Sequence, residues 1–228
     1  MLRALIFDFD GILVDSEPMI MRLTQQMAAQ EGWEISEEEY FRDYLALDDR
    51  GIIEHLYATH HRPVNSARRD ELIAWKARAY WEIIREGLPA MPGAVDFVRE
   101  AAAAYPLAIA SGSLRREIGH LLVKLGLREH FSALATADDC QRSKPDPEVF
   151  RIALARLQQH TAFRTEPLQA AECLVIEDAP AGIDAAHAAG MKCLALTHSR
   201  NVEELRCAEW VCAEFAEVDL RRIAAEFE

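Results

Sequence analysis

Short runs of apolar residues alternate with segments of helical periodicity along most of this 228-residue chain. Each run is too short for a helix and too uniformly apolar for a half-exposed strand, so it predicts a strand buried on both faces. The runs are Leu5–Phe7, Leu107–Ala110, Ser132–Ala135, Leu174–Ile176 and Cys193–Leu196. The helical patterns between them are Ala94–Ala104, Arg115–Leu125, Pro147–Gln159 and Ala181–Ala189. This alternation predicts an α/β fold with a doubly wound parallel sheet, whose ligands bind at the carboxyl ends of the strands.

The stretch from about Glu17 to Leu88 breaks this alternation and reads as helical throughout. The predicted helices are Pro18–Gln30, Ser36–Tyr44, Arg50–Thr59 and Ser66–Arg85. Ser36 followed by Glu39 predicts a capping box. The simplest architecture is an all-helical cap domain, residues 17–88, inserted into a core domain of residues 1–16 and 89–228. A module at this place in the chain is expected to act as a lid that excludes water and selects substrates.

Composition and charge narrow the choice of partners. Half of the residues are hydrophobic, enough for a substantial core, and the formal net charge of -13 argues against nucleic acid or an anionic membrane as a partner. An anionic substrate would therefore need positive charge concentrated at its site. The five cysteines are scattered among apolar stretches and indicate buried free thiols in a reducing compartment. With no secretory signal or membrane-length apolar stretch, we expect a cytoplasmic protein, as a monomer or weak dimer.

Two aspartates follow the first apolar run, in the segment Asp8-Phe9-Asp10-Gly11. In a strand, residues i and i+2 point to the same side, roughly 6.5 Å apart, so Asp8 and Asp10 can face one reacting group. Neighbouring carboxylates repel each other and lose hydration on burial unless a cation or a function compensates. Solvated acids in a turn are the alternative interpretation of this pair taken alone.

Three later strands also end in chemically suited residues. Ser111 and Gly112 follow the second strand and offer a hydroxyl and backbone amides to an anion, although a helix cap would look the same. Lys144 follows the third strand just ahead of a helix start, where it would supply positive charge or lie exposed. Glu177 and Asp178 follow the fourth strand, where two acids suit a cation or cap the next helix.

In a doubly wound sheet these strand ends converge on one crevice. Oxygen ligands from Asp8, Asp178 and Glu177, with a main-chain carbonyl near Asp10, suit Mg²⁺ far better than zinc. Together with Lys144 and the Ser111 loop, Mg²⁺ would hold the oxygens of a phosphoryl group. Asp8 would attack that group to form an aspartyl phosphate, while Asp10 serves as acid and then base.

Four motifs at these strand ends resemble the signatures of the haloacid dehalogenase superfamily, which has a Rossmann-like core. They are the segments Asp8–Asp15, Ala110–Ser113, Lys144–Pro147 and Ile176–Gly182. The helical insert resembles the cap of the phosphatase and β-phosphoglucomutase branch. The resemblance implies that Asp8 is the nucleophile and Asp10 the acid/base. It implies that phosphate is bound by Ser111, Gly112 and Lys144. The implied Mg²⁺ ligands are Asp8, Asp10 through its carbonyl, Glu177 and Asp178. True dehalogenases lack the second aspartate, so Asp10 argues against halide displacement.

Cap and rim residues are expected to choose the substrate. Arg50 aligns with an arginine that binds the distal phosphate in β-phosphoglucomutases, and Lys76 matches a cap lysine of that family. Arg115 stands where the mutases have an asparagine. Arg50 and Arg115 would bind a second anionic group on the substrate. The alternative is that each is a solvated surface arginine.

Other departures favour hydrolysis over mutase activity. Ala46 and Leu47 replace a lysine and a glycine of the mutases, and Ile20 replaces a cap histidine. We therefore expect a phosphatase acting on a small phosphorylated metabolite such as a sugar phosphate. The alternatives are a β-phosphoglucomutase-type mutase, a phosphonate-cleaving enzyme that would use Lys76, and a non-catalytic protein that only binds phosphorylated metabolites. Asp10 and Lys144 are both retained, which argues against the last.

Overall fold

The chain forms two compact units in a computed structural model that describes residues 1–45 and 47–227. The core unit consists of Met1–Asp15 and Leu88–Glu228, and the helical unit consists of Ser16–Gly87. Ala46, one of the departures from the mutase pattern, lies outside the described residues. No helix among the described residues has both the length and the apolar character needed to cross a membrane.

The core unit is built on a six-stranded parallel sheet with the order β3-β2-β1-β4-β5-β6. Its strands are β1 Ala4–Phe7, β2 Leu107–Ala110, β3 Phe131–Ala135, β4 Cys173–Glu177, β5 Lys192–Leu196 and β6 Trp210–Cys212. The predicted fold and all five predicted strands are confirmed. The sequence reading missed β6, because a partly exposed edge strand of three residues lacks the uniform apolar run that marked the others.

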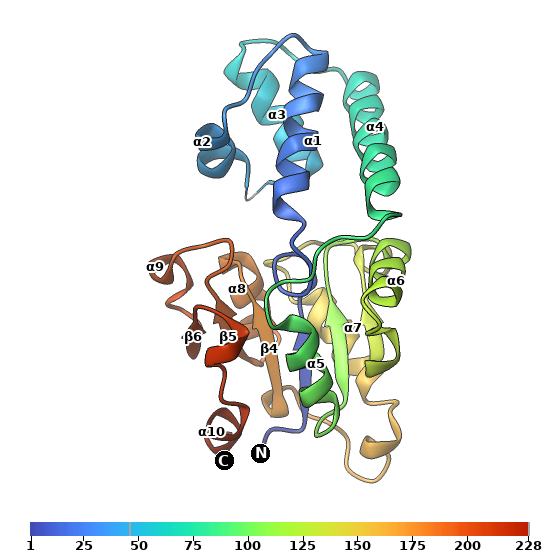
Figure 1. Ribbon diagram of the computed structural model, residues 1–228, viewed down its shortest axis with the longest axis vertical. Coiled ribbons are helices and arrows are strands. Elements are labelled where there is room, and N and C mark those ends of the chain that lie inside the picture. Colours follow the sequence, from blue (N-terminus) through green and yellow to red (C-terminus); the bar gives the residue numbers. More distant parts are fainter. Residues whose placement is uncertain (46, 228) are drawn as a thin grey trace. The chain divides into compact units, whose positions relative to one another are not determined.

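Helices cover both faces of this sheet (Figure 1). They are α5 Ala94–Ala102, α6 Arg115–Lys124, α7 Glu148–Leu157, α8 Pro180–Ala188, α9 Val202–Leu205 and α10 Leu220–Ala225. On one face, the Phe7 ring packs edge-on against Phe97 of α5 at 6.1 Å between centroids. On the other, Phe150 of α7 and Ile183 of α8 join a fully buried cluster with Ile6. Burial on both faces explains why the strands read as continuous apolar runs.

The helical unit contains α1 Glu17–Gln30, α2 Glu37–Glu39, α3 Asp49–Thr59 and α4 Ser66–Ile84. The predicted helix Ser36–Tyr44 is corrected to α2 followed by a π-helical turn over Tyr40–Tyr44. The capping box between Ser36 and Glu39 is present, with both reciprocal hydrogen bonds. Tyr40 and Tyr44 are buried beside Ile53 and Leu56 in this unit's own apolar cluster.

The cysteines follow their prediction only in part. All five are free thiols, and Cys173 and Cys193 are buried in the sheet. Cys207 is exposed and Cys140 and Cys212 are partly buried, so burial was overestimated for these three.

Candidate active site

Asp8 leaves the centre of the sheet directly after β1. Its amide donates to the carbonyl of Ile176 in β4 at 2.9 Å, which keeps its backbone in line with the sheet. The chain then turns sharply, with the Leu13 amide bonded to the Phe9 carbonyl at 2.8 Å. Gly11 has a φ of +73°, and a Cβ there would lie 2.1 Å from Oδ2 of Asp178. Glycine is therefore required both by the turn and by the close approach of that carboxylate.

Lys144 joins the ends of β1 and β4 through two ion pairs. Its Nζ lies 2.8 Å from Oδ1 of Asp8 and 2.6 Å from Oε1 of Glu177. The other oxygen of Glu177 accepts the amides of Asp178 and Ala179 at 3.0 and 3.1 Å. Both oxygens of this fully buried carboxylate are thus satisfied, which fixes the position of the lysine.

Gly182, at the start of α8, makes room for Glu177. A Cβ at this position would lie 1.9 Å from Oε1 of Glu177. Helix α8 can therefore pack against the end of β4 only if this residue has no side chain. The motif Ile176–Gly182 ends on this residue, but the sequence pattern does not indicate the packing requirement.

The electrostatics of this cluster are dominated by burial. Burial acts to lower the pKa of Lys144, but the charges of Asp8 and Glu177 outweigh it and raise that pKa above its ordinary value. Burial raises the pKa of Asp178 well above its ordinary value, and the charges of Glu177 and Asp8 raise it further. Burial likewise raises the pKa of Glu177, opposed by Lys144. Three carboxylates, two of them buried and that of Asp8 half-buried, face one ammonium group, so a further positive charge would stabilise their ionised forms.

A divalent cation fits this need. Asp8, Glu177 and Asp178 each offer a carboxylate oxygen, and these oxygens lie within 4.8 Å of one another. A set made only of oxygen atoms suits a hard cation such as Mg²⁺ and lacks the nitrogen and sulfur ligands typical of zinc. The role of the Asp10 carbonyl as a further ligand stays a prediction.

The Ser111 loop follows β2 and meets the loop that carries Lys144. Ser111 is buried, its amide donates to Ala135 at 3.1 Å, and its hydroxyl accepts the Ser113 amide at 3.0 Å. Ser111, Gly112 and Lys144 line one small pocket of about 80 Å³. The predicted phosphate-binding residues therefore surround a common space.

Two serines contact the acids of the site and were not among the predicted residues. The Ser113 hydroxyl donates to Oδ2 of Asp10 at 2.5 Å, and the Ser199 hydroxyl donates to Oδ2 of Asp178 at 2.5 Å. Ser113 belongs to the same Ser-Gly-Ser segment as Ser111, so its strand-end position was a usable signal. Ser199 follows β5 and carries no comparable motif.

His198, next to Ser199, fixes the turn after Asp8. Its Nδ1 lies 2.8 Å from the carbonyl of Gly11, so the hydrogen-bonding pattern assigns a proton to Nδ1. His198 was not among the predicted site residues. The structure makes it a support of the Gly11 turn.

Two of the three expected substrate residues belong to the helical unit and one belongs to the core unit. In the helical unit, Lys76 is 5 % exposed and pairs with Oδ1 of Asp49 at 2.6 Å, while Arg50 is exposed at the start of α3. In the core unit, the Arg115 guanidinium bonds to Asp139 at 2.5 Å and to the carbonyl of Leu134 at 3.3 Å. Their roles toward substrate stay predictions.

Known proteins resemble the chain over most of its length. A family model described as haloacid dehalogenase-like hydrolase matches residues 5–196. Hexitol phosphatase B of Escherichia coli (strain K12) is 32% identical over 194 residues, which cover 83% of this chain and 81% of that protein. Fructose-1-phosphate phosphatase of the same organism is 30% identical over 196 residues, covering 82% and 92% respectively.

A solved structure shares the fold across the whole chain. It is a β-phosphoglucomutase from Clostridium difficile, with a TM-score of 0.83, 22% sequence identity and coverage of 100% of this chain and 97% of that one. At this identity the likeness concerns the fold alone. With the family match, it confirms the resemblance drawn from the four motifs.

Proposed function

This chain belongs to the haloacid dehalogenase-like hydrolase family, as a hydrolase of the phosphatase type, and we propose that its substrates are sugar phosphates. We further propose that its activity depends on Mg²⁺. The observation that carries the proposal is the cluster of Asp8, Lys144, Glu177 and Asp178 at the strand ends. The names of the two phosphatase relatives support phosphorylated sugars and sugar alcohols as the substrate class.

In the first step, a carboxylate oxygen of Asp8 attacks the phosphorus while the bond to the ester oxygen breaks. Protonated Asp10 gives its proton to the departing alkoxide, which leaves as the free sugar. Lys144 and the Ser111 loop hold the phosphoryl oxygens. Ser113, bonded to Asp10, keeps that side chain oriented for proton transfer.

In the second step, ionised Asp10 takes a proton from a water molecule whose oxygen attacks the phosphorus of the aspartyl phosphate. The bond to Asp8 breaks, so the products are inorganic phosphate and an enzyme with Asp8 ionised and Asp10 protonated again. Bound Mg²⁺ supplies positive charge that offsets the carboxylates and the phosphoryl oxygens.

Direct metal contact is assigned to Asp8 and Asp178. Both oxygens of Glu177 already accept hydrogen bonds, from Lys144 on one side and from backbone amides on the other. Glu177 holds Lys144 in place and fixes the backbone at Asp178, and its carboxylate stays within reach of the same metal position.

The test is phosphate release from a panel of sugar and sugar-alcohol phosphates in the presence of Mg²⁺. Wild type should release phosphate, and Asp8→Asn should lose at least about 10⁴-fold in turnover because the nucleophile is gone. Circular dichroism of the variant controls for folding. Equal release by both proteins would contradict the proposal.

The same panel separates the alternatives. A mutase would convert β-glucose 1-phosphate to glucose 6-phosphate when a trace of bisphosphate is supplied, without releasing phosphate. A non-catalytic binding protein would bind these compounds and turn over none of them. For the cap, we propose that Arg50 binds a second anionic group of the substrate. Arg50→Gln should therefore raise KM for substrates with two anionic groups, such as bisphosphates, and leave KM for monophosphates unchanged.

A further inference from the structure

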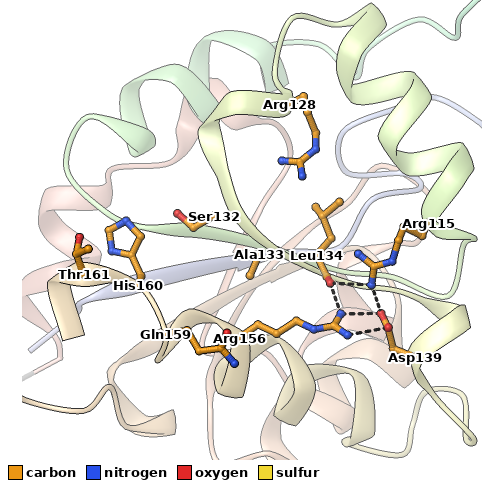
Figure 2. A pocket seen from close by; sticks show the side chains of 10 residues that line it. All are labelled: Arg115, Arg128, Ser132, Ala133, Leu134, Asp139, Arg156, Gln159, His160 and Thr161. Carbon is orange, nitrogen blue, oxygen red and sulfur yellow. Dashed lines mark hydrogen bonds and ion pairs between the residues drawn. The ribbon is translucent and has the colours of Figure 1, made fainter. Parts of the chain in front are cut away.

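An arginine-rich pocket of about 790 Å³ runs along the outer edge of strand β3 in the core unit (Figure 2). Its walls come from the start of α6, from β3 and the turns before and after it, and from the end of α7 with the turn that follows. Its principal polar residues are Arg115, Arg128, Ser132, Asp139, Arg156 and His160. None of the residues around the Asp8 cluster lines this pocket.

The charges of the pocket do not cancel. Arg115 and Arg156 share one carboxylate, Asp139, at 2.5 Å and 2.7 Å, as the dashed lines of Figure 2 show. Arg128 donates to the carbonyl of Phe131 at 3.2 Å and forms no ion pair with any residue the structure describes. Among the residues that line the pocket, three guanidinium groups against one carboxylate leave an excess of two positive charges, in a chain whose formal net charge is -13.

This excess does not vanish at neutral pH. The hydrogen bonds from Arg156 hold the pKa of Asp139 far below its usual range, against the effect of burial and with help from Thr136. Asp139 is therefore ionised throughout the neutral range, and arginine does not deprotonate in proteins. The pocket stays cationic under all physiological conditions.

Hydrogen-bond donors remain available around the pocket. Ser132 is exposed on the edge strand. The Nδ1 atom of His160 accepts the amide of Ala162 at 3.2 Å, so the proton of the neutral ring lies on Nε2. Arg128 uses only one of its terminal nitrogens, which leaves most of its donor fork for a ligand.

An added β-strand does not suit this edge. The carbonyl of Phe131 accepts a hydrogen bond from Arg128, and the carbonyl of Leu134 accepts hydrogen bonds from Arg115 and Arg156. Two of the acceptors that a pairing strand would need are therefore occupied. The exposed groups favour a ligand that brings acceptors and negative charge.

We propose that this pocket is a second ligand site, which binds a small molecule carrying two or more phosphate groups. Guanidinium groups match phosphate oxygens in geometry and charge, and here they stand on both sides of the edge strand. A single phosphate would engage only one wall of a pocket this large. The site is independent of the chemistry at Asp8.

The test is isothermal titration of the full-length protein with tripolyphosphate, without Mg²⁺, at pH 7.5. Wild type should bind, and higher salt should weaken the binding because the contacts are ionic. Arg128→Gln should bind roughly tenfold or more weakly, the loss expected for a charge-assisted hydrogen bond. The matched control is Arg206→Gln, which makes the same charge change at an exposed arginine beside α9 and should bind as wild type does.

Three further measurements on variants complete the test. His160→Asn keeps an acceptor for the Ala162 amide but removes the Nε2 donor, so it should also weaken binding. Ser111→Ala should bind tripolyphosphate unchanged, and Arg128→Gln should keep wild-type turnover. The proposal is overturned if wild type does not bind tripolyphosphate, or if Arg128→Gln and Arg206→Gln bind it alike. It is also overturned if only Ser111→Ala loses this binding, or if a glutamate octapeptide binds more tightly than tripolyphosphate.

Discussion

The core unit contains two clusters of charged side chains that differ in sign and in burial. At the carboxyl ends of β1 and β4, Glu177 and Asp178 are almost fully buried and the carboxylates outnumber their one lysine. Along the edge of β3, arginines outnumber Asp139 and lie open to solvent, with the Arg115 side chain 44% exposed. One cluster lacks positive charge and the other has it in excess.

The difference in burial determines how strongly the unbalanced charge of each cluster lowers the free energy of unfolding. A buried charge without a partner loses its hydration, so the carboxylate cluster depends on Lys144 and on a cation. Water screens the arginines at the β3 edge, so their excess charge is tolerated without a ligand. Removing a charge should therefore have a large effect in the first cluster, whereas removing an exposed arginine from the second should have a small one.

The largest expected effect is that of Lys144→Met measured without Mg²⁺. Loss of the lysine leaves Asp8 and Glu177 unpaired, which should lower the free energy of unfolding by about 3–5 kcal/mol at pH 7. Urea unfolding followed by circular dichroism measures this. Arg128→Gln is the exposed counterpart and should stay within about 0.5 kcal/mol of wild type. Similar losses in both variants would refute the distinction by burial.

A smaller loss is expected from Gly182→Ala. Its methyl group would overlap the Glu177 carboxylate, so either α8 or Glu177 must move, at a cost of about 3 kcal/mol. Gly119 in α6 is the matched control, because a Cβ there meets nothing within 4 Å. Gly119→Ala should be neutral or stabilising by up to about 1 kcal/mol. Thermal unfolding of the two variants tests the contrast, and a harmless Gly182→Ala would disprove the close packing.

Mg²⁺ should stabilise the folded protein even without substrate. At a hundred times its dissociation constant, the ion adds about 2.7 kcal/mol if it binds only the folded state. The rise in Tm on titration with MgCl₂ measures this. Asp178→Asn should remove most of the rise, while Asp139→Asn should retain it. A rise of equal size in Asp178→Asn would place the ion elsewhere.

Acid should reduce the stability that ionised Asp139 contributes to the folded protein. Because Arg156 lowers the pKa of Asp139 in the folded state, the carboxylate contributes stability above its ordinary pKa of 3.8, and this contribution is lost as the pH falls below that value. Asp139→Asn should therefore cost about 2 kcal/mol near neutral pH. The gap in Tm between wild type and variant should be constant above about pH 5 and narrow progressively as the pH falls below about 4. A gap that widens in acid would contradict this sign.

The buried strands were predictable because helices cover both faces of the sheet. Leu107–Ala110 coincides with β2, and the ends of the other four runs fall within one residue of the ends of their strands. The helices of the helical unit were also predictable from their periodicity. The pattern did not reveal the π-helical turn at Tyr40–Tyr44, because buried tyrosines four residues apart also suit an α-helix.

Much of the candidate site was also readable, because parallel strands bring their carboxyl ends to one edge. Asp8, Lys144, Glu177 and Asp178 meet as the strand-end positions predicted. Ser199 could not be anticipated, since its link to Asp178 depends on how the loop after β5 folds back. The bond from Arg115 to Asp139 at the β3 edge could not be anticipated either, and the role of Arg115 toward substrate stays a prediction.

The sequence by itself determined the order of strands and helices and the residues that stand at the strand ends. Those features follow from local periodicity and from the regular geometry of a parallel sheet. Only the tertiary structure decided which atoms meet: the pairing of Lys144 with two carboxylates, the close contacts that require Gly11 and Gly182, and the arginine pocket beside β3. Contacts between loops distant in sequence depend on packing in three dimensions, which no periodicity along the chain encodes.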